Sequence, residues 1–267
     1  MARGLGDVLH YFLPDEIAGA GERASWRTAP GAPPRLEAAA LPIVALPVAE
    51  RDVVRAALAW NLTVEIARLG ASASLLAPKL GDGGLLWPEP GRGPVGAELV
   101  HSPAHDLGSL YRDAADVAVQ RAAELAEGGV VVACVPPHWL RSSADDAALL
   151  RWALLFATPD GRDLLETYAL TKFLLRRRPD AKVGITIHGV RRIAEAERAF
   201  ERLAGVAARH LGRAPRSYGL LVDDLHVYRA IVARRPIGLE HPQSPAAKAL
   251  RDVARLVLAD ARTENRV

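Results

Sequence analysis

One cysteine and two histidines have the residue types of a nucleophilic site. Cys134 and His138 lie four residues apart at the end of an apolar run, and His188 ends another apolar run. A thiolate can attack as a nucleophile with an imidazole as base, provided that the thiol is exposed and a third group orients the base. The simpler interpretation, which we favour, is that Cys134 fills space in the core and His138 caps a loop.

A second group has the residue types of a metal site. His101, His105 and Asp106 have a spacing that could ligate a metal on a helix. Pro103 lies between the two histidines and disfavours helical geometry. We therefore expect a solvated loop at these positions and no metal site in the chain.

Basic residues gather in the second half of the sequence. Lys172 and residues 176–178 form a cluster near the end of a predicted helix. Such patches bind DNA or anionic membranes in some proteins, but cations at the end of a helix also stabilise its dipole. DNA binding stays an alternative, whereas the end of the chain lacks the bulky apolar face of a membrane-binding helix. Further arginines in this half are Arg209, Arg213, Arg216, Arg234 and Arg235.

Composition limits the class of protein. Half of the 267 residues are hydrophobic, which is enough to bury a sheet, and the net charge of +3 is too small to indicate nucleic acid by itself. The longest apolar runs, residues 128–137 and 152–157, are too short to span a bilayer. A single cysteine excludes an internal disulfide, and no signal peptide is recognisable. We expect a cytoplasmic protein without a transmembrane segment.

The candidate residues named above lie in a chain in which short apolar runs alternate with helical patterns. Short apolar runs are typical of strands buried on both faces, and helical periodicity lies between them, as in residues 54–69 and 196–206. Ser244 and Pro245 predict the start of a last helix, and Asp224 can cap the helix before it. The pattern predicts an α/β fold, with a doubly wound, mostly parallel sheet flanked by helices in three layers. The expected strands lie at residues 43–46, 73–77, 130–135, 152–157, 183–187 and 218–222.

The first 34 residues differ from the rest of the chain. They begin with an amphipathic stretch and continue as a linker rich in Gly, Ala and Pro over residues 19–34. We expect residues 1–34 to be a tethered motif and residues 35–267 to form one α/β domain. The motif either packs on its own domain or docks on a partner. Its apolar residues are Leu5, Val8, Leu9, Phe12 and Leu13.

Four stretches resemble motifs of the MinD/ParA family of P-loop ATPases. They are N-L-T-V-E-I-A-R-L-G at 61–70, T-P-D-G-R-D-L-L-E-T-Y-A-L-T-K at 158–172, G-L-L-V-D-D-L-H-V at 219–227 and H-P-Q-S-P-A-A-K-A-L at 241–250. The second, third and fourth are most similar to the branch of the flagellar-number regulator FlhG. The resemblance covers most of residues 42–258 and implies a P-loop NTPase fold.

The same resemblance implies a degenerate nucleotide site. The family's phosphate loop G-K-G-G-V-G-K-T-T falls on residues 49–57, which contain no glycine. Its signature lysine becomes Glu50, its phosphate-binding lysine becomes Arg55, and its Mg²⁺-binding hydroxyl becomes Ala56. Glu50 and Asp52 would repel phosphate, and Arg55 alone could still pair with an anion.

The family's other chemical positions are also replaced. Its D-x-D carboxylates fall on Ala77 and Lys79, and its Walker B aspartate falls on Cys134. The asparagine that reads adenine becomes His188, and a proline of the base pocket becomes Val222. Without these groups Mg²⁺ has no ligands and the charge of the transition state is not stabilised. We expect no catalytic residues, no metal, and neither ATP nor Mg²⁺ as cofactor.

The sequence therefore predicts a pseudo-ATPase that acts as a scaffold or regulator through protein binding. The resemblance suggests polar or flagellar placement or cell division, with an active paralogous ATPase as one possible partner. The alternatives are an ATPase with an atypical phosphate loop and a DNA-associated partitioning protein, and the oligomeric state stays open. Trp87, in a Gly/Pro-rich loop, is a partner contact if exposed and a packing residue if buried. The candidate partner contacts are Leu5, Leu9, Phe12, Leu13 and Trp87.

Overall fold

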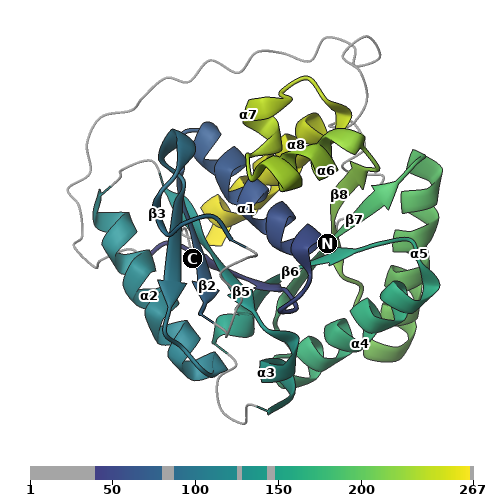
Figure 1. Ribbon diagram of the computed structural model, residues 1–267. Helices are drawn as coiled ribbons and strands as arrows, with labels where there is room; N and C mark the ends of the chain where they lie inside the picture. The colour runs from purple at the N-terminus through teal and green to yellow at the C-terminus, as the bar shows by residue number, and fades with distance from the viewer. Residues whose placement is uncertain (1–39, 80–86, 125–127, 143–147, 265–267) are drawn as a thin grey trace, which may run out of the picture.

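The computed structural model describes residues 40–79, 87–124, 128–142 and 148–264 (Figure 1). The amphipathic stretch with Leu5, Leu9, Phe12 and Leu13 lies outside these ranges, so its predicted role stays a prediction. In the described part of the chain, none of the helices combines the length and apolar character needed to cross a membrane.

The described strands form one eight-stranded sheet, ordered β3-β4-β2-β5-β1-β6-β7-β8. All neighbours pair in parallel except the short edge strand β3, which runs antiparallel to β4. The predicted α/β fold is therefore confirmed. The strands are β1 (Ile43–Pro47), β2 (Ser72–Pro78), β3 (Gly91–Arg92), β4 (Glu98–Ser102), β5 (Gly129–Val135), β6 (Trp152–Ala157), β7 (Lys182–Val190) and β8 (Arg216–Val222).

Helices cover both faces of the sheet (Figure 1). From β1 to β2 the chain moves in one direction across the sheet, so a right-handed crossover places α1 on one face. From β4 to β8 it moves in the opposite direction, so the helices from α2 to α5 lie on the other face. Helix α8 packs beside α1. The helices are α1 (Val53–Arg68), α2 (Leu107–Glu124), α3 (Pro137–Ser142), α4 (Gly161–Arg177), α5 (Ile193–Leu211), α6 (Leu225–Ala233), α7 (Ile237–Glu240) and α8 (Pro245–Glu264), with 3₁₀ turns η3 (Pro94–Gly96) and η4 (Leu149–Arg151).

All six predicted strands are present, and the predicted helix starts are confirmed. The Ser244 hydroxyl accepts from the N–H of Ala247, Pro245 is the first residue of α8, and the Asp224 carboxylate accepts from the N–H of His226 in α6. Strands β3 and β4 were not predicted, because β3 has only two residues and β4 carries Glu98 and His101 within its apolar pattern.

Two loop predictions are wrong. His101 lies in β4 rather than in a solvated loop, and His138 lies in the short helix α3 rather than capping a loop. His105 is highly exposed, as expected, and Asp106 caps the first turn of α2 by accepting from the N–H of Ser109.

Candidate functional site

The site lies at the carboxyl edge of the central strand β1. Strand β1 is hydrogen-bonded between β5 and β6, and the connections that follow β1 and β6 leave for opposite faces of the sheet. Such a reversal opens a crevice at the carboxyl ends of the strands, which is where open α/β sheets bind ligands. The residues aligned with the phosphate loop occupy this edge.

The loop between β1 and α1 uses its own backbone N–H groups. The N–H of Asp52 donates to the carbonyl of Ala49 (3.0 Å), and the N–H of Val53 donates to the carbonyl of Arg51 (3.1 Å). A phosphate loop instead directs successive N–H groups at the phosphate oxygens. These two donors are therefore committed to the turn.

The amino end of α1 carries a carboxylate from the chain itself. Asp52 is the N-cap residue, and its side chain accepts from the N–H of Arg55 at 2.9 Å. Its carbonyl accepts from the N–H of Ala56 at 3.0 Å. The amino end of a helix favours negative charge, and a carboxylate stabilises it as a phosphate would. Asp52 thus supplies this charge without a ligand.

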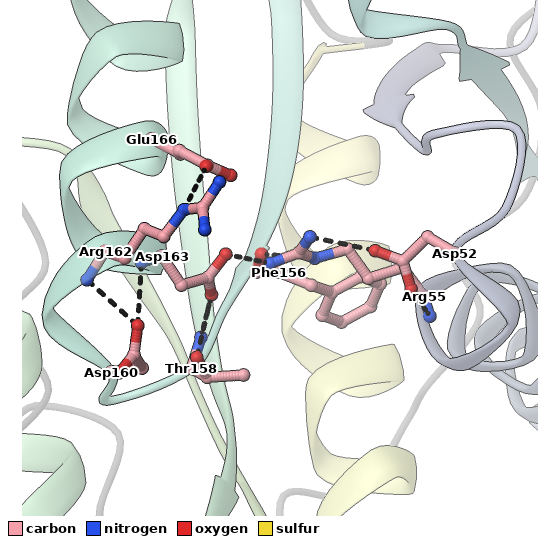
Figure 2. Close-up of polar contacts among 8 residues, drawn as sticks. All are labelled: Asp52, Arg55, Phe156, Thr158, Asp160, Arg162, Asp163 and Glu166. Carbon is pink, nitrogen blue, oxygen red and sulfur yellow. Dashed lines mark hydrogen bonds and ion pairs between the residues drawn. The ribbon is translucent and has the colours of Figure 1, made fainter.

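Arg55 joins α1 to β6 and α4, as Figure 2 shows. Its Nε donates to the carbonyl of Phe156 at 3.0 Å, and its two terminal nitrogens contact Asp52 at 2.9 Å and Asp163 at 2.5 Å. The Asp163 carboxylate also accepts from the N–H and the hydroxyl of Thr158. The guanidinium is therefore held on three sides by acceptors of the chain.

The charges of this network stabilise one another. Burial disfavours the charged forms of Arg55 and Asp163, but their mutual ion pair and hydrogen bonds outweigh it. The pKa of Arg55 is raised and the pKa of Asp163 is lowered, with Thr158 contributing to the second shift. Arg55 and Asp163 are therefore in their charged forms at neutral pH, and the carboxyl group of Asp52 lies on the other side of the guanidinium.

His188 in β7 and Cys134 in β5 are both buried, and the strands β1 and β6 lie between them in the sheet. His188 packs edge-on against Phe156, and its Nε2 has no hydrogen-bond partner among the described residues. Burial and the positive charge of Arg55 lower the pKa of His188 to about 4, so the ring is neutral at pH 7. Cys134 is 2% exposed, and burial raises the pKa of its thiol. A buried, protonated thiol is a poor nucleophile.

The remaining aligned positions offer little to a metal or phosphate. Ala56 and Ala77 are fully buried methyl groups, and Lys79 is exposed after β2. Glu50 is half exposed and lies 3.7 Å from the imidazole of His138. Within the described ranges, no three His, Cys, Asp or Glu side chains come together as a metal site.

Trp87 is 7% exposed and belongs to the hydrophobic core. It lines a small cavity with Trp60 of α1 and Ile231 of α6, so its ring packs inside rather than forming an exposed partner contact. Of the two alternatives for this residue, packing is the one that the structure contains.

Several of the basic residues are paired within the chain. Arg178 contacts Asp180, and Arg216 lies 3.7 Å from Asp260. Arg235 pairs with Glu240, and Arg213 donates to the carbonyl of Pro179. Arg178, Arg216 and Arg235 therefore each have a carboxylate nearby, whereas the carbonyl of Pro179 leaves the charge of Arg213 unchanged.

Comparison with known proteins identifies solved structures that share this fold. No family model and no curated protein matches the sequence. Among solved structures, the MinD cell division protein of Aquifex aeolicus matches with a TM-score of 0.59 and 14% identity, covering 82% of this chain and 97% of its own. The fold is that of MinD and ParA.

Two further structures agree with this assignment. A chain of the MinC:MinD cell division protein complex of Aquifex aeolicus matches with a TM-score of 0.58 and 12% identity, over 82% of this chain and 96% of its own. A ParA family ATPase from Chlorobium tepidum TLS matches with a TM-score of 0.54 and 14% identity, over 80% and 98%. At such identities the MinD/ParA likeness establishes the fold alone.

The partner of Arg55 was not identified from the sequence. Asp163 and Thr158 were recognised as part of a family-like motif but were given no role. The segment D-G-R-D at 160–163 does contain a helix-start signal, since Asp160 caps α4 by accepting from the N–H groups of Arg162 and Asp163. A capped helix start places its first-turn side chains at the carboxyl edge, where Arg55 also lies.

Proposed function

We propose that this chain is a non-catalytic MinD/ParA-like protein that works by binding a protein partner, as a scaffold or regulator. The main support is the Asp52–Arg55–Asp163 network. The residue aligned with the phosphate-binding lysine is engaged by two carboxylates and a carbonyl. An incoming phosphate would have to displace these acceptors and would meet uncompensated carboxylate charge.

Metal-assisted chemistry lacks ligands at the aligned positions. Mg²⁺ takes oxygen ligands from hydroxyl groups, carboxylates and the substrate's phosphates. The corresponding positions offer the methyl groups of Ala56 and Ala77 and the buried thiol of Cys134. A nucleotide and its Mg²⁺ therefore do not fit the residues present, and we assign no step to them.

The test of this proposal is isothermal titration of the full chain with ATP and ADP, each with and without Mg²⁺. At about 100 μM protein, an affinity near 10 μM would give clear heat. We expect none, whereas an active MinD under the same conditions should give a normal isotherm. Saturable, Mg²⁺-dependent heat from this chain would contradict the proposal and favour the alternative, an ATPase in which Arg55 replaces the lysine.

The biological process is inferred from the fold and from the FlhG-like motifs. We place the protein in cell division or in polar or flagellar placement, with an active paralogous ATPase among the candidate partners. One structural relative is a complex of MinD with MinC, which is an example of the fold assembling with a partner protein. DNA-associated partitioning remains a weaker alternative, because several arginines are paired within the chain.

The partner-binding part of the proposal has its own test. A tagged full-length chain and a chain lacking residues 1–34 are used to retain the active paralogue from the same cells. If the N-terminal motif is the contact, the deletion should abolish retention while the circular dichroism spectrum stays that of a folded α/β domain. Equal retention by both chains would exclude the motif and assign the contact to the domain.

A further inference from the structure

A cavity of about 380 Å³ lies between α3 and α4, below the carboxyl edge of β1 and β6. This volume is within the range of small-molecule sites, and the position is the one where open α/β sheets bind ligands. Most of its lining is apolar. The apolar residues include Pro47, Leu140, Leu155, Phe156, Leu170 and Phe173.

Among the charged residues that line the cavity, carboxylates outnumber cations. Arg55, Asp163 and Glu166 line the cavity, with Thr167 beside them. The hydrogen-bonding groups of Arg55 and Asp163 are largely occupied, since each side chain already has several hydrogen-bond partners within the chain. Glu166 is different. Its side chain is 62% exposed and forms a 3.3 Å ion pair with Arg162, whose own side chain is 87% exposed.

The lining therefore discriminates by charge. An anion in this cavity would approach two carboxylates, and the guanidinium of Arg55 is already neutralised by Asp52 and Asp163. A cation would find the Glu166 carboxylate at the same end. Exposed ion pairs such as that between Arg162 and Glu166 are weak, so a ligand can replace Arg162 at little cost.

We propose that this cavity binds a small organic cation with an apolar body, with the body between α3 and α4 and the charged head on Glu166. An alkylammonium or arylalkylammonium group has this chemistry, either as a free amine or as the side chain of a lysine in a peptide. The cavity is lined in part by Ala49, Arg55 and Asp163, so the inference rests on the proposed function, in which no phosphate occupies this edge of the sheet. The nucleotide titration tests that function separately from the cation probes used here.

The test compares three six-carbon probes that differ only in the head group. Hexylammonium, hexanol and hexanoate are titrated into the ¹⁵N-labelled full chain, and amide shifts are followed by NMR. We expect hexylammonium to bind about tenfold more tightly than hexanoate, with hexanol between them and shifts concentrated in α3 and α4. Equal affinities for hexylammonium and hexanoate, or shifts elsewhere, would overturn the proposal.

Two variants and one control locate the site. Glu166→Gln should weaken hexylammonium by about two- to fivefold and leave hexanol unchanged. Ala169→Trp places a ring at the cavity from an exposed helical position and should abolish binding of every probe. Glu240→Gln removes a comparable ion pair with Arg235, away from the cavity, and should change nothing. Retained binding in the Ala169→Trp variant would refute the location.

A last comparison distinguishes the two sources of the cation. The peptide acetyl-Leu-Lys-amide is titrated beside hexylammonium and beside acetyl-Leu-norleucine-amide, which lacks the charge. Tighter binding of the lysine peptide than of both other probes would identify a protein segment as the source. Tighter binding of hexylammonium would identify a free amine. Tightest binding of the norleucine peptide would contradict the assigned role of Glu166.

Discussion

Replacing Arg55 with alanine tests whether its network stabilises the junction of α1, β6 and α4. The substitution removes three hydrogen bonds, to Asp52, Asp163 and the carbonyl of Phe156. It also leaves the largely buried Asp163 carboxylate with Thr158 as its remaining donor among the contacts described above. The side chains of Arg55 and Asp163 are 22% and 16% exposed, so solvent compensates only in part.

The expected loss lies between two limits. Breaking a fully buried ion pair from one side costs about 3–5 kcal/mol, and exposed pairs contribute about 0–1 kcal/mol. For partly exposed partners we expect a decrease of about 2–3 kcal/mol in the free energy of unfolding. For a domain of this size this corresponds to a lower Tm by very roughly 4–12 °C.

Urea unfolding followed by circular dichroism measures this loss, with Arg162→Ala as the matched control. Arg162 directly precedes Asp163 in α4, but its side chain is 87% exposed, so its removal should cost about 0.5 kcal/mol or less. The pH dependence adds a second check. The pKa of Asp163 is lowered in the folded state, so its contribution is fully present above its unfolded pKa, near 3.8, and is lost as the pH falls through the folded value.

The stability difference between the native chain and Arg55→Ala should therefore narrow below pH 4 through Asp163. A smaller narrowing should begin near pH 6.5, because the variant lacks the positive charge that helps to lower the pKa of His188. Equal stability of the two proteins at pH 7 would refute the structural role of the network. A difference that is unchanged at pH 3 would refute its electrostatic origin.

Three further predictions concern buried groups. Cys134 should not react with iodoacetamide in the folded protein at pH 8 and should react fully in urea, since it is buried and its thiol pKa is raised. Gly238→Ala should lower the free energy of unfolding by about 2 kcal/mol, because the added methyl group meets the carboxylate of buried Glu65; an unchanged Tm would contradict this. The His188 ring should stay neutral by NMR down to about pH 5, and stability should fall by up to about 3 kcal/mol as pH drops from 6.5 to 4, because the unfolded ring takes up the proton first.

The central strands could be predicted from the sequence because they are apolar on both faces. β5 and β6 read as uninterrupted apolar runs, and the first residue of α8 follows from Ser244 and Pro245. Strand β4 is not predicted from the sequence, because the polar residues Glu98 and His101 break its apolar pattern. Short strands near an edge give too few residues for periodicity to be recognised.

The candidate site could be predicted only in part, because it depends on contacts between distant residues. The alignment identified Arg55 as a charged residue at the phosphate position, but its pairing with Asp163 spans 108 residues. A sequence pattern within one helix or strand cannot show that two residues so far apart in the chain are in contact. The same holds for Trp87, whose flanking glycines and prolines indicate a loop and say nothing of the cavity it lines with Trp60.

The 108-residue separation between Arg55 and Asp163 has a consequence for the order of folding. Closing a flexible loop of that length costs about 4 kcal/mol of chain entropy, so the contact forms only after the sheet has brought β1 and β6 together. Interactions that form after the transition state slow unfolding and leave the folding rate nearly unchanged. We therefore expect Arg55→Ala to raise the unfolding rate and to leave the folding rate nearly unchanged.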